Sequence, residues 1–291
     1  MLTRFHKVLI VLLAAQVGLA VAIQLRHDDA APPKEHPLLA GFDAAKVTHI
    51  QITDKAGKPI DLAKQGTSWV IASGFNYPVP EAKIDELLAP IAKMSAATPI
   101  ATKATSEKQL HVADADFTHK ITVTANGKDT TFFVGAPVGM RRMAFRFAND
   151  PNVYAVGSLY TSAEPNEWMD AKYVDIPKAD ITKVTVDKDG SSLVIDPADK
   201  SLDANKVSTI VGDVAEIQPL APGDPKRDAT HPTATVTIER KGAPVVLDVI
   251  ADGDHYWVKQ RGLDKAVTVT KNAVQEVLDA TKDSLVKKTA S

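Results

Sequence analysis

Two histidines and two aspartates lie close together in the segment HVADADFTH: His111, Asp114, Asp116 and His119. Imidazole nitrogens and carboxylate oxygens bind zinc and hard cations when several of them converge on one point. This segment lies in the connection before an expected strand, where no regular element would aim the side chains at a common centre. We therefore interpret it as a solvated loop and predict no metal site in the chain.

Three arginines in the segment GMRRMAFRF are the best candidates for binding a polar ligand. On a β-strand, Arg142 and Arg146 share one face and Arg141 lies on the other. Two guanidinium groups on one face could hold a carboxylate or a phosphate through paired hydrogen bonds. The alternative, which we favour, is a solvent-facing strand edge that its charges protect from aggregation. We retain Arg142, Arg146 and Arg141 as the candidate ligand-binding residues.

Two acidic turns and a set of aromatic residues have simpler explanations than ligand binding. Neither turn has the full run of oxygen ligands of a calcium loop, and Asp and Gly suit hairpin turns. The turns comprise Asp187, Asp189 and Gly190 in one case and Asp252, Gly253 and Asp254 in the other. The aromatic residues could form a ligand platform, but core packing and interface anchoring are commoner uses. They are Trp69, Trp168, Trp257, Tyr154 and Tyr256.

The sequence contains no recognisable catalytic or cofactor-binding motif. Ser158 and Ser191 follow glycines, but neither stands in a G-x-S-x-G nucleophile turn. The phosphate-binding P-loop, the dinucleotide fingerprint and the H-E-x-x-H metal motif are also missing. We predict no catalytic residues, no cofactor and no enzymatic activity.

Length and composition limit the classes of function. The chain has 291 residues, a formal net charge of −2 and no cysteine. The length allows two domains with full hydrophobic cores. The charge balance argues against nucleic acid as a partner, because phosphate binding needs clustered positive charge. The lack of cysteine excludes disulfides, thiolate metal sites and a lipidated N-terminal cysteine.

The N-terminal region resembles a membrane-targeting segment. Arg4 and Lys7 precede an uncharged, mostly apolar run over residues 8–25, and Arg26 closes it. As a helix this run would measure about 27 Å, just enough for the hydrocarbon layer of a bilayer. The basic flank predicts a cytoplasmic N-terminus and a body in the periplasm.

Two interpretations of this segment remain open. Residues 1–26 could be a transmembrane anchor in the bacterial inner membrane. The triplet Ala20-Val21-Ala22 also fits a signal-peptidase site, so that cleavage after Ala22 is the alternative. Residues 27–44, which are rich in Ala, Pro and charge, are expected to form a tether.

An internal repeat indicates how the body is organised. Residues 45–52 and 179–186 both alternate apolar and polar residues, as half-buried strands do, and both lead into a Gly turn. A segment with apolar residues at helical spacing follows in each half. The helical positions are Ile84, Leu87, Leu88 and Ile91 in the first half, and Val207, Ile210, Val211 and Val214 in the second.

Hairpins follow the helical segments in both halves. Their turns are expected at Asn126-Gly127 and at Lys241-Gly242. We therefore predict an α+β fold of two tandem modules, residues 45–177 and residues 178–291, after an N-terminal transmembrane helix. Each module would be a curved antiparallel sheet with one amphipathic helix packed on it.

The order of these segments resembles a known family. It comprises the strand at 47–52, Trp69-Val70, the T-V-T strand at 122–124, Phe133-Val134-Gly135, the strand at 153–156 and Trp168-Met169-Asp170. This order is similar to the bacterial family called domain of unknown function 4340, over roughly residues 45–290. The resemblance implies an accessory component of gliding-motility-type ABC transport systems, with an N-terminal span and a periplasmic body. It carries over no catalytic residues.

From the resemblance we expect a non-enzymatic, membrane-anchored periplasmic accessory subunit of an ABC-type transport system, acting by protein–protein contact or substrate guidance. Its partners would be the permease and ATPase subunits and the inner membrane, and not nucleic acid. The alternative is a periplasmic binding module for a small anionic or glycan ligand, held between the modules. A third possibility, an unrecognised hydrolase, needs a convergent catalytic set that we do not find in the sequence.

Overall fold

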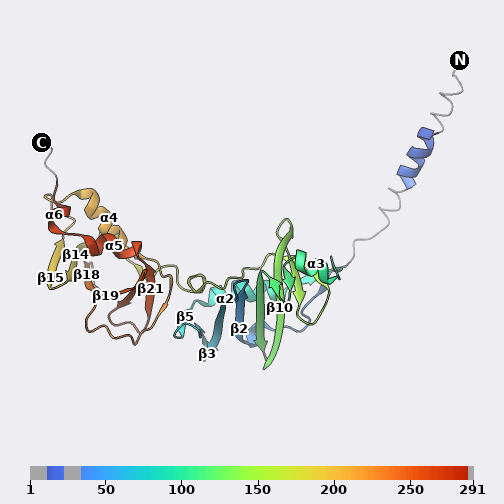
Figure 1. Ribbon diagram of the computed structural model, residues 1–291, viewed down its shortest axis with the longest axis horizontal. Coiled ribbons are helices and arrows are strands. Elements are labelled where there is room, and N and C mark those ends of the chain that lie inside the picture. Colours follow the sequence, from blue (N-terminus) through green and yellow to red (C-terminus); the bar gives the residue numbers. More distant parts are fainter. Residues whose placement is uncertain (1–11, 23–33, 288–291) are drawn as a thin grey trace, which may run out of the picture.

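A computed structural model describes residues 12–22 and 34–287 of the chain. Strands make up 41% of the structure and helical segments 24%, and the strands form several sheets. Two large antiparallel sheets lie next to each other along the long axis of the molecule (Figure 1). The predicted α+β class is therefore wrong: the body is mostly β-structure, because additional strands extend the two large sheets and six more form three small sheets of their own.

The first sheet has eight strands in the order β12-β11-β10-β9-β2-β3-β4-β5. Their bounds are β2 (Val47–Asp54), β3 (Pro59–Gln65), β4 (Ser68–Ile71), β5 (Tyr77–Val79), β9 (His119–Ala125), β10 (Lys128–Gly139), β11 (Arg142–Phe147) and β12 (Val153–Gly157). Buried residues alternate along β2, where Val47 begins the pattern and Ile50 and Ile52 continue it. This alternation is the physical basis of the period-two pattern in the sequence.

The second sheet has seven strands in the order β15-β14-β18-β19-β20-β21-β17. Their bounds are β14 (Ile181–Lys188), β15 (Ser191–Ile195), β17 (Ala221–Gly223), β18 (Ala234–Arg240), β19 (Val245–Asp252), β20 (His255–Gln260) and β21 (Ala266–Thr270). Both predicted hairpin turns are confirmed: Ala125 pairs with Lys128 across the first, and Ile238 pairs with Val245 across the second.

The two large sheets share one strand order. If β2 is matched with β14 and β3 with β15, then β9, β10, β11 and β12 correspond in order to β18, β19, β20 and β21. The additions differ. Strands β4 and β5 extend the first sheet beyond β3, whereas β17 extends the second sheet beyond β21. Strand β15 is therefore an outer strand, although its counterpart β3 lies inside its sheet.

Three two-stranded sheets accompany the large ones. The first pairs β1 (His36–Pro37) with β6 (Ser95–Ala96), and the second pairs β13 (Val174–Asp175) with β16 (Glu216–Ile217). Because β1 precedes β2 as β13 precedes β14, these pairs occupy corresponding places in the two halves. The third pairs β7 (Val112–Ala113) with β8 (Asp116–Phe117) and lies against the first large sheet.

The helical segments are short. Besides a helix at residues 12–22, the α-helices are α2 (Glu81–Ala92), α3 (Ala104–Gln109), α4 (Ala204–Ala215), α5 (Asn272–Asp279) and α6 (Lys282–Leu285). The 3-10 turns are η1 (Ala44–Lys46), η2 (Pro165–Trp168) and η3 (Lys178–Asp180). The eight apolar residues predicted to form the buried faces of α2 and α4 are all buried, which confirms the helical spacing. Asp203 caps α4 by accepting hydrogen bonds from the backbone of Asn205 and Lys206.

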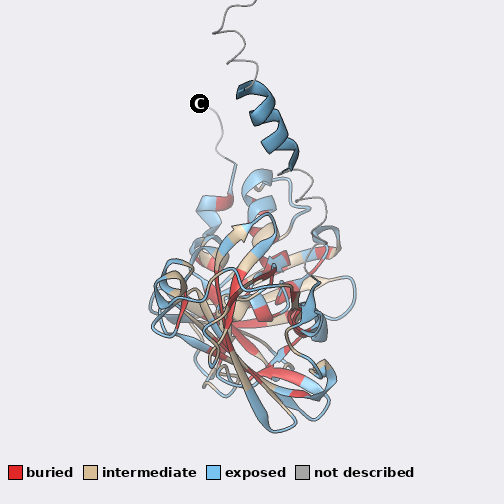
Figure 2. Cartoon of the chain, turned by 90° about the vertical axis from the view of Figure 1, so that its right-hand side faces the viewer, coloured by how far each residue is buried: buried red, intermediate tan, exposed pale blue. Residues whose placement is uncertain are grey.

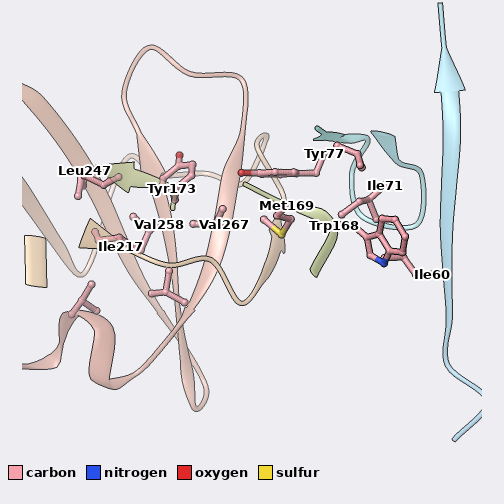
Figure 3. Packing of buried hydrophobic residues seen from close by; sticks show 14 of the residues in the cluster. Ile60, Ile71, Tyr77, Trp168, Met169, Tyr173, Ile217, Leu247, Val258 and Val267 are labelled. Atoms are coloured by element: carbon pink, nitrogen blue, oxygen red, sulfur yellow. The ribbon is translucent and has the colours of Figure 1, made fainter. Parts of the chain in front are cut away.

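The two large sheets share one hydrophobic core. A single cluster of buried side chains contains residues of both sheets and of the segment that joins them, while exposed residues cover the outside (Figure 2). Trp168 and Met169, both fully buried, lie between the sheets together with Tyr77 (Figure 3). The hydroxyl of Tyr173 donates to the Lys265 carbonyl at 2.8 Å and accepts from the Gln260 backbone at 2.9 Å. This junction is therefore a packed interior.

The N-terminal predictions need correction. Residues 12–22 form an exposed helix about 17 Å long, and the rest of the predicted anchor lies outside the described residues. No helix among residues 12–22 and 34–287 is long and apolar enough to cross a membrane. This finding overturns the predicted transmembrane helix and the predicted single-pass location in the bacterial inner membrane. The described part of the expected tether, from residue 34, contains β1 and hydrogen-bonds to the body through Leu38, whose backbone donates to Met94.

Candidate functional site

The three candidate arginines lie in different environments at one end of the first sheet. Arg141 occupies the β10–β11 turn with a positive φ of 55°, and Arg142 begins β11. The Nη2 of Arg142 donates to the Ala155 carbonyl at 2.6 Å. Arg146 is buried, with 4% of its surface exposed. Four residues along a strand separate Arg142 from Arg146 by about 13 Å, and the structure binds their guanidinium groups to different parts of the chain.

The guanidinium group of Arg146 fastens a neighbouring segment to the sheet. Its nitrogens donate to backbone carbonyls at 2.7 to 3.4 Å, those of Val112, Phe147, Ala148 and Asp150. It also binds the carboxylate of Asp114 and lies 4.7 Å from the ring centre of Phe133. Glu107 approaches its Nε at 3.7 Å. Because its donors are occupied within the chain, Arg146 connects β11 to the segment that contains α3, β7 and β8.

The histidines and aspartates around β7 and β8 are engaged separately. The Nδ1 of His111 lies 2.9 Å from Asp116, Asp114 binds Arg146, and the Nδ1 of His119 lies 3.0 Å from the Thr161 hydroxyl. Burial lowers the pKa of His119, and the nearby charge of Asp54 offsets this shift in part. The described part of the chain contains no group of three or more His, Cys, Asp or Glu residues that could hold a metal ion.

The acidic turns and the tryptophans have structural roles. Asp189 and Gly190, with φ of 51° and 74°, connect β14 to β15, and Gly253, with φ of 62°, connects β19 to β20. These are the predicted hairpin turns. Trp69, Trp168 and Trp257 are all buried. The indole nitrogens of the last two donate to backbone carbonyls, those of Ser162 and Asp224.

A cavity that the sequence did not indicate lies beside α4 and α5. Its volume is about 690 Å³, and its lining includes Lys178, Thr209, Gly212, Asp213, Gln218 and Thr270. These residues come from η3, α4, the segment after β16 and the end of β21. Ammonium, carboxyl, hydroxyl and amide groups therefore face one space, an arrangement that can hydrogen-bond a small polar molecule.

Gly212 brings the ammonium group of Lys178 close to helix α4. A Cβ atom at Gly212 would lie 2.6 Å from the Nζ of Lys178, so only glycine permits this approach without a shift. Burial raises the pKa of the Asp213 carboxyl, the charge of Glu276 adds to the rise, and Lys178 opposes it. A glycine inside a helix costs about 1 kcal/mol relative to alanine, so a glycine within an apolar helical pattern needs an explanation. The glycine at position 212 was the one signal in the sequence that could have indicated the cavity.

Comparison with family models gives a match over residues 69–231, to the family described as Domain of unknown function (DUF4340). The match covers more than half of the 291 residues. It begins at β4 in the first sheet and ends just before β18 in the second, so it includes the junction and both α2 and α4. No curated protein and no solved structure matches the chain. The chain therefore belongs to the domain of unknown function 4340 family.

Proposed function

We propose that this protein is an accessory subunit of an ABC-type transport system and acts by contact with other proteins, without catalysis of its own. The transport context comes from the family resemblance. The observation that carries the contact role is the single hydrophobic cluster that joins the two large sheets. Two sheets held by one core form a long body with fixed spacing, which suits a subunit that positions other subunits.

The use of the reactive side chains supports a role in contact. Arg146 is occupied by backbone carbonyls, His111 by Asp116, and the buried tryptophans by the core. Catalysis would require a nucleophile or an acid–base pair that faces an open site. The side chains of Arg146, His111 and His119 instead form hydrogen bonds within the chain.

The β10–β11 turn is the best candidate for a contact with another subunit. Met140 at its tip is 92% exposed, and Arg141 follows it with a positive φ. Methionine and arginine are both enriched in protein interfaces. A fully exposed methionine has no stabilising role in the isolated chain, since its side chain is in water.

Affinity purification of the full chain through a C-terminal tag tests the proposal. We expect mass spectrometry to identify permease and ATPase subunits in the eluate. The double substitution Met140→Ser and Arg141→Ser should reduce the recovery of these subunits at least fivefold. Lys128→Ser, next to the Asn126-Gly127 turn at the other end of β10, should leave their recovery unchanged. Recovery of the tagged chain alone, from both wild type and variants, would contradict the accessory role.

A second candidate function, the binding of a small glycan, is favoured by the cavity at Lys178. Its hydroxyl and amide groups are suited to a polyol, whereas Asp213 disfavours a purely anionic ligand. Most residues that line the cavity belong to the second half, and Asn166 of η2 is the one that comes from before residue 178. A thermal-shift screen with soluble oligosaccharides tests this function, with Thr270→Val as the variant expected to abolish any stabilisation by ligand.

A further inference from the structure

Three of the four outer strands of the large sheets are closed to further pairing. Strand β5 has Pro78 at its centre and β17 has Pro222, and proline lacks the N–H group that a sheet ladder needs. Strand β12 is covered by another segment: Val153 donates to the Ala101 carbonyl at 2.8 Å. Arg142 also occupies the Ala155 carbonyl of β12.

In the described part of the chain, the fourth outer strand, β15, lacks such protection. Its sequence, SSLVI over Ser191–Ile195, has neither proline nor charge, and Val194 is 53% exposed. In the first sheet the corresponding strand β3 is covered by β4, but within residues 12–22 and 34–287 the second sheet has no counterpart of β4. An exposed, uncharged outer strand readily pairs with another chain.

We propose that β15 pairs antiparallel with β15 of a second copy of this chain, around a two-fold axis at Val194. Val194 then faces Val194 of the second copy, and Leu193 faces Ile195. Ser192 faces Asp196, so that the hydroxyl can donate to the carboxylate. Identical strands meet in this way in a symmetric dimer, and the two second sheets become one continuous sheet.

The first sheet shows the type of strand that covers this position. Ile50 pairs with Leu62 there, and Val184 pairs with Ile195 in the second sheet, so Leu62 and Ile195 occupy corresponding places. Leu62 faces Ile71 of β4. In the proposed dimer Ile195 faces Leu193 of the second copy. In both sheets an apolar branched side chain therefore faces the corresponding residue, Leu62 in the first sheet and Ile195 in the second. This similarity favours β15 of a second copy as the strand that pairs with β15.

A groove beside β15 also gains from the pairing. It has a volume of about 620 Å³ and lies between β15 and the α5–α6 junction. Val186, Leu193 and Leu278 contribute apolar side chains to its lining. Residues that face each other in an antiparallel pair point to the same side of the sheet. Leu193 and Ile195 of the second copy therefore extend along the open side of this groove and reduce its exposure to water.

Single cysteines provide a direct test, because the natural chain has none. In the proposed register the two Cβ atoms of a Val194→Cys dimer are about 5 Å apart, close to the range of a disulfide. The two copies of residue 192 are about 14 Å apart, which is out of reach. Under mild oxidation of the full chain we expect Val194→Cys to form linked dimers at least tenfold faster than Ser192→Cys. Equal rates for the two variants would overturn the proposal.

Sedimentation velocity tests the dimer without a covalent link. One pair of five-residue strands buries less than a standard interface, so the mass should rise with concentration between about 1 µM and about 1 mM. Val194→Lys places two ammonium groups at the two-fold axis and should keep the chain monomeric. Ser192→Lys makes the same charge change but faces Asp196, so it should retain the dimer. Equal thermal melting of both variants shows that they are folded.

Two results of the sedimentation experiment would overturn the proposal: a wild-type chain that stays monomeric at every concentration, and a dimer that persists in Val194→Lys. If the wild type is monomeric and Val194→Lys also reduces the recovery of permease subunits in the affinity purification, β15 pairs with a strand of a different protein. The inference does not rest on the accessory role, because the cross-linking and sedimentation measurements both use the purified chain alone.

Discussion

Replacement of Arg146 by methionine should be one of the most damaging single changes in the first sheet. Methionine keeps part of the apolar volume over Phe133 but removes every hydrogen-bond donor of the guanidinium group. The carbonyl of Val112, 2.7 Å from Nε, then loses its charged partner in the interior. The carboxylate of Glu107, with 15% of its side chain exposed, loses the positive charge that lies 3.7 Å away.

The expected loss of stability follows from these contacts. Removal of one partner from a buried charge interaction costs about 3–5 kcal/mol, because the other partner remains unpaired away from water. Asp114 adds little to this loss, since 77% of its side chain is exposed and water can replace the arginine. We therefore expect Arg146→Met to lower the free energy of unfolding of the chain by about 3–5 kcal/mol. A domain has only about 5–15 kcal/mol in total.

Urea unfolding followed by tryptophan fluorescence measures this loss, and hydrogen exchange over residues 104–118 locates it. Arg142→Met is the matched control, because it removes one hydrogen bond from an exposed arginine and should cost about 1 kcal/mol. The loss of stability in Arg146→Lys should lie between those of Arg146→Met and Arg142→Met. Lysine keeps the positive charge, but one ammonium group cannot reach all the acceptors that surround the planar guanidinium group. A loss below about 1 kcal/mol for Arg146→Met, or a loss equal to that of Arg142→Met, would refute the fastening role.

Three further predictions follow from single residues. The pKa of His119 is lowered in the folded chain, so below a pH of about 6.5 the unfolded chain binds the proton more strongly than the folded chain. Stability should therefore decrease as the pH is lowered below about 6.5, and it should decrease less in His119→Asn. Thermal melting measured at a series of pH values tests this. The pKa of Asp213 is raised, so its contribution to stability falls as pH rises above about 3.8, and Asp213→Asn should raise the melting temperature at pH 7 but not near pH 3. A Cβ atom at Gly135 would lie 2.0 Å from the Leu110 carbonyl, so Gly135→Ala should cost more than about 3 kcal/mol in urea unfolding. Gly157→Ala, which has open space around it, should cost less than about 1 kcal/mol, and equal costs would contradict the contact.

Local patterns in the sequence predicted the elements that depend on local physics. The spacing of Ile84, Leu87, Leu88 and Ile91 identified the buried face of α2, because side chains three and four residues apart share a helix face. The Asn126-Gly127 pair identified a hairpin, because both residues tolerate positive φ, and both have it here. In such cases the residues that determine the structure are neighbours in the chain.

The fold class was wrong because strands of two or three residues leave no periodic pattern. Strands β1, β6, β13 and β16 have two residues each, and only pairing with a distant segment makes them strands. The transmembrane prediction relied on composition over residues 8–25, of which the structure describes an 11-residue helix at 12–22.

The candidate site could be predicted least, because its contacts join distant parts of the chain. Arg146 was correctly placed on a strand, but its partner Val112 lies 34 residues earlier, and nothing in GMRRMAFRF indicates that contact. The cavity at Lys178 also depends on a glycine in α4 and on residues near the end of β21. Sequence spacing identifies the face of an element, whereas the surroundings of that face depend on tertiary packing.

The packed junction between the large sheets determines how the protein can be dissected. Strand β13 lies before residue 178, yet it pairs with β16, which lies after it. The hydroxyl of Tyr173 likewise hydrogen-bonds to the backbone of Gln260 in β20 and of Lys265 just before β21. A fragment that begins at residue 178 would lack both, and a fragment that ends there would expose Trp168 and Met169 to water. Either half produced alone should therefore aggregate, and a soluble second half would have to start upstream of Tyr173.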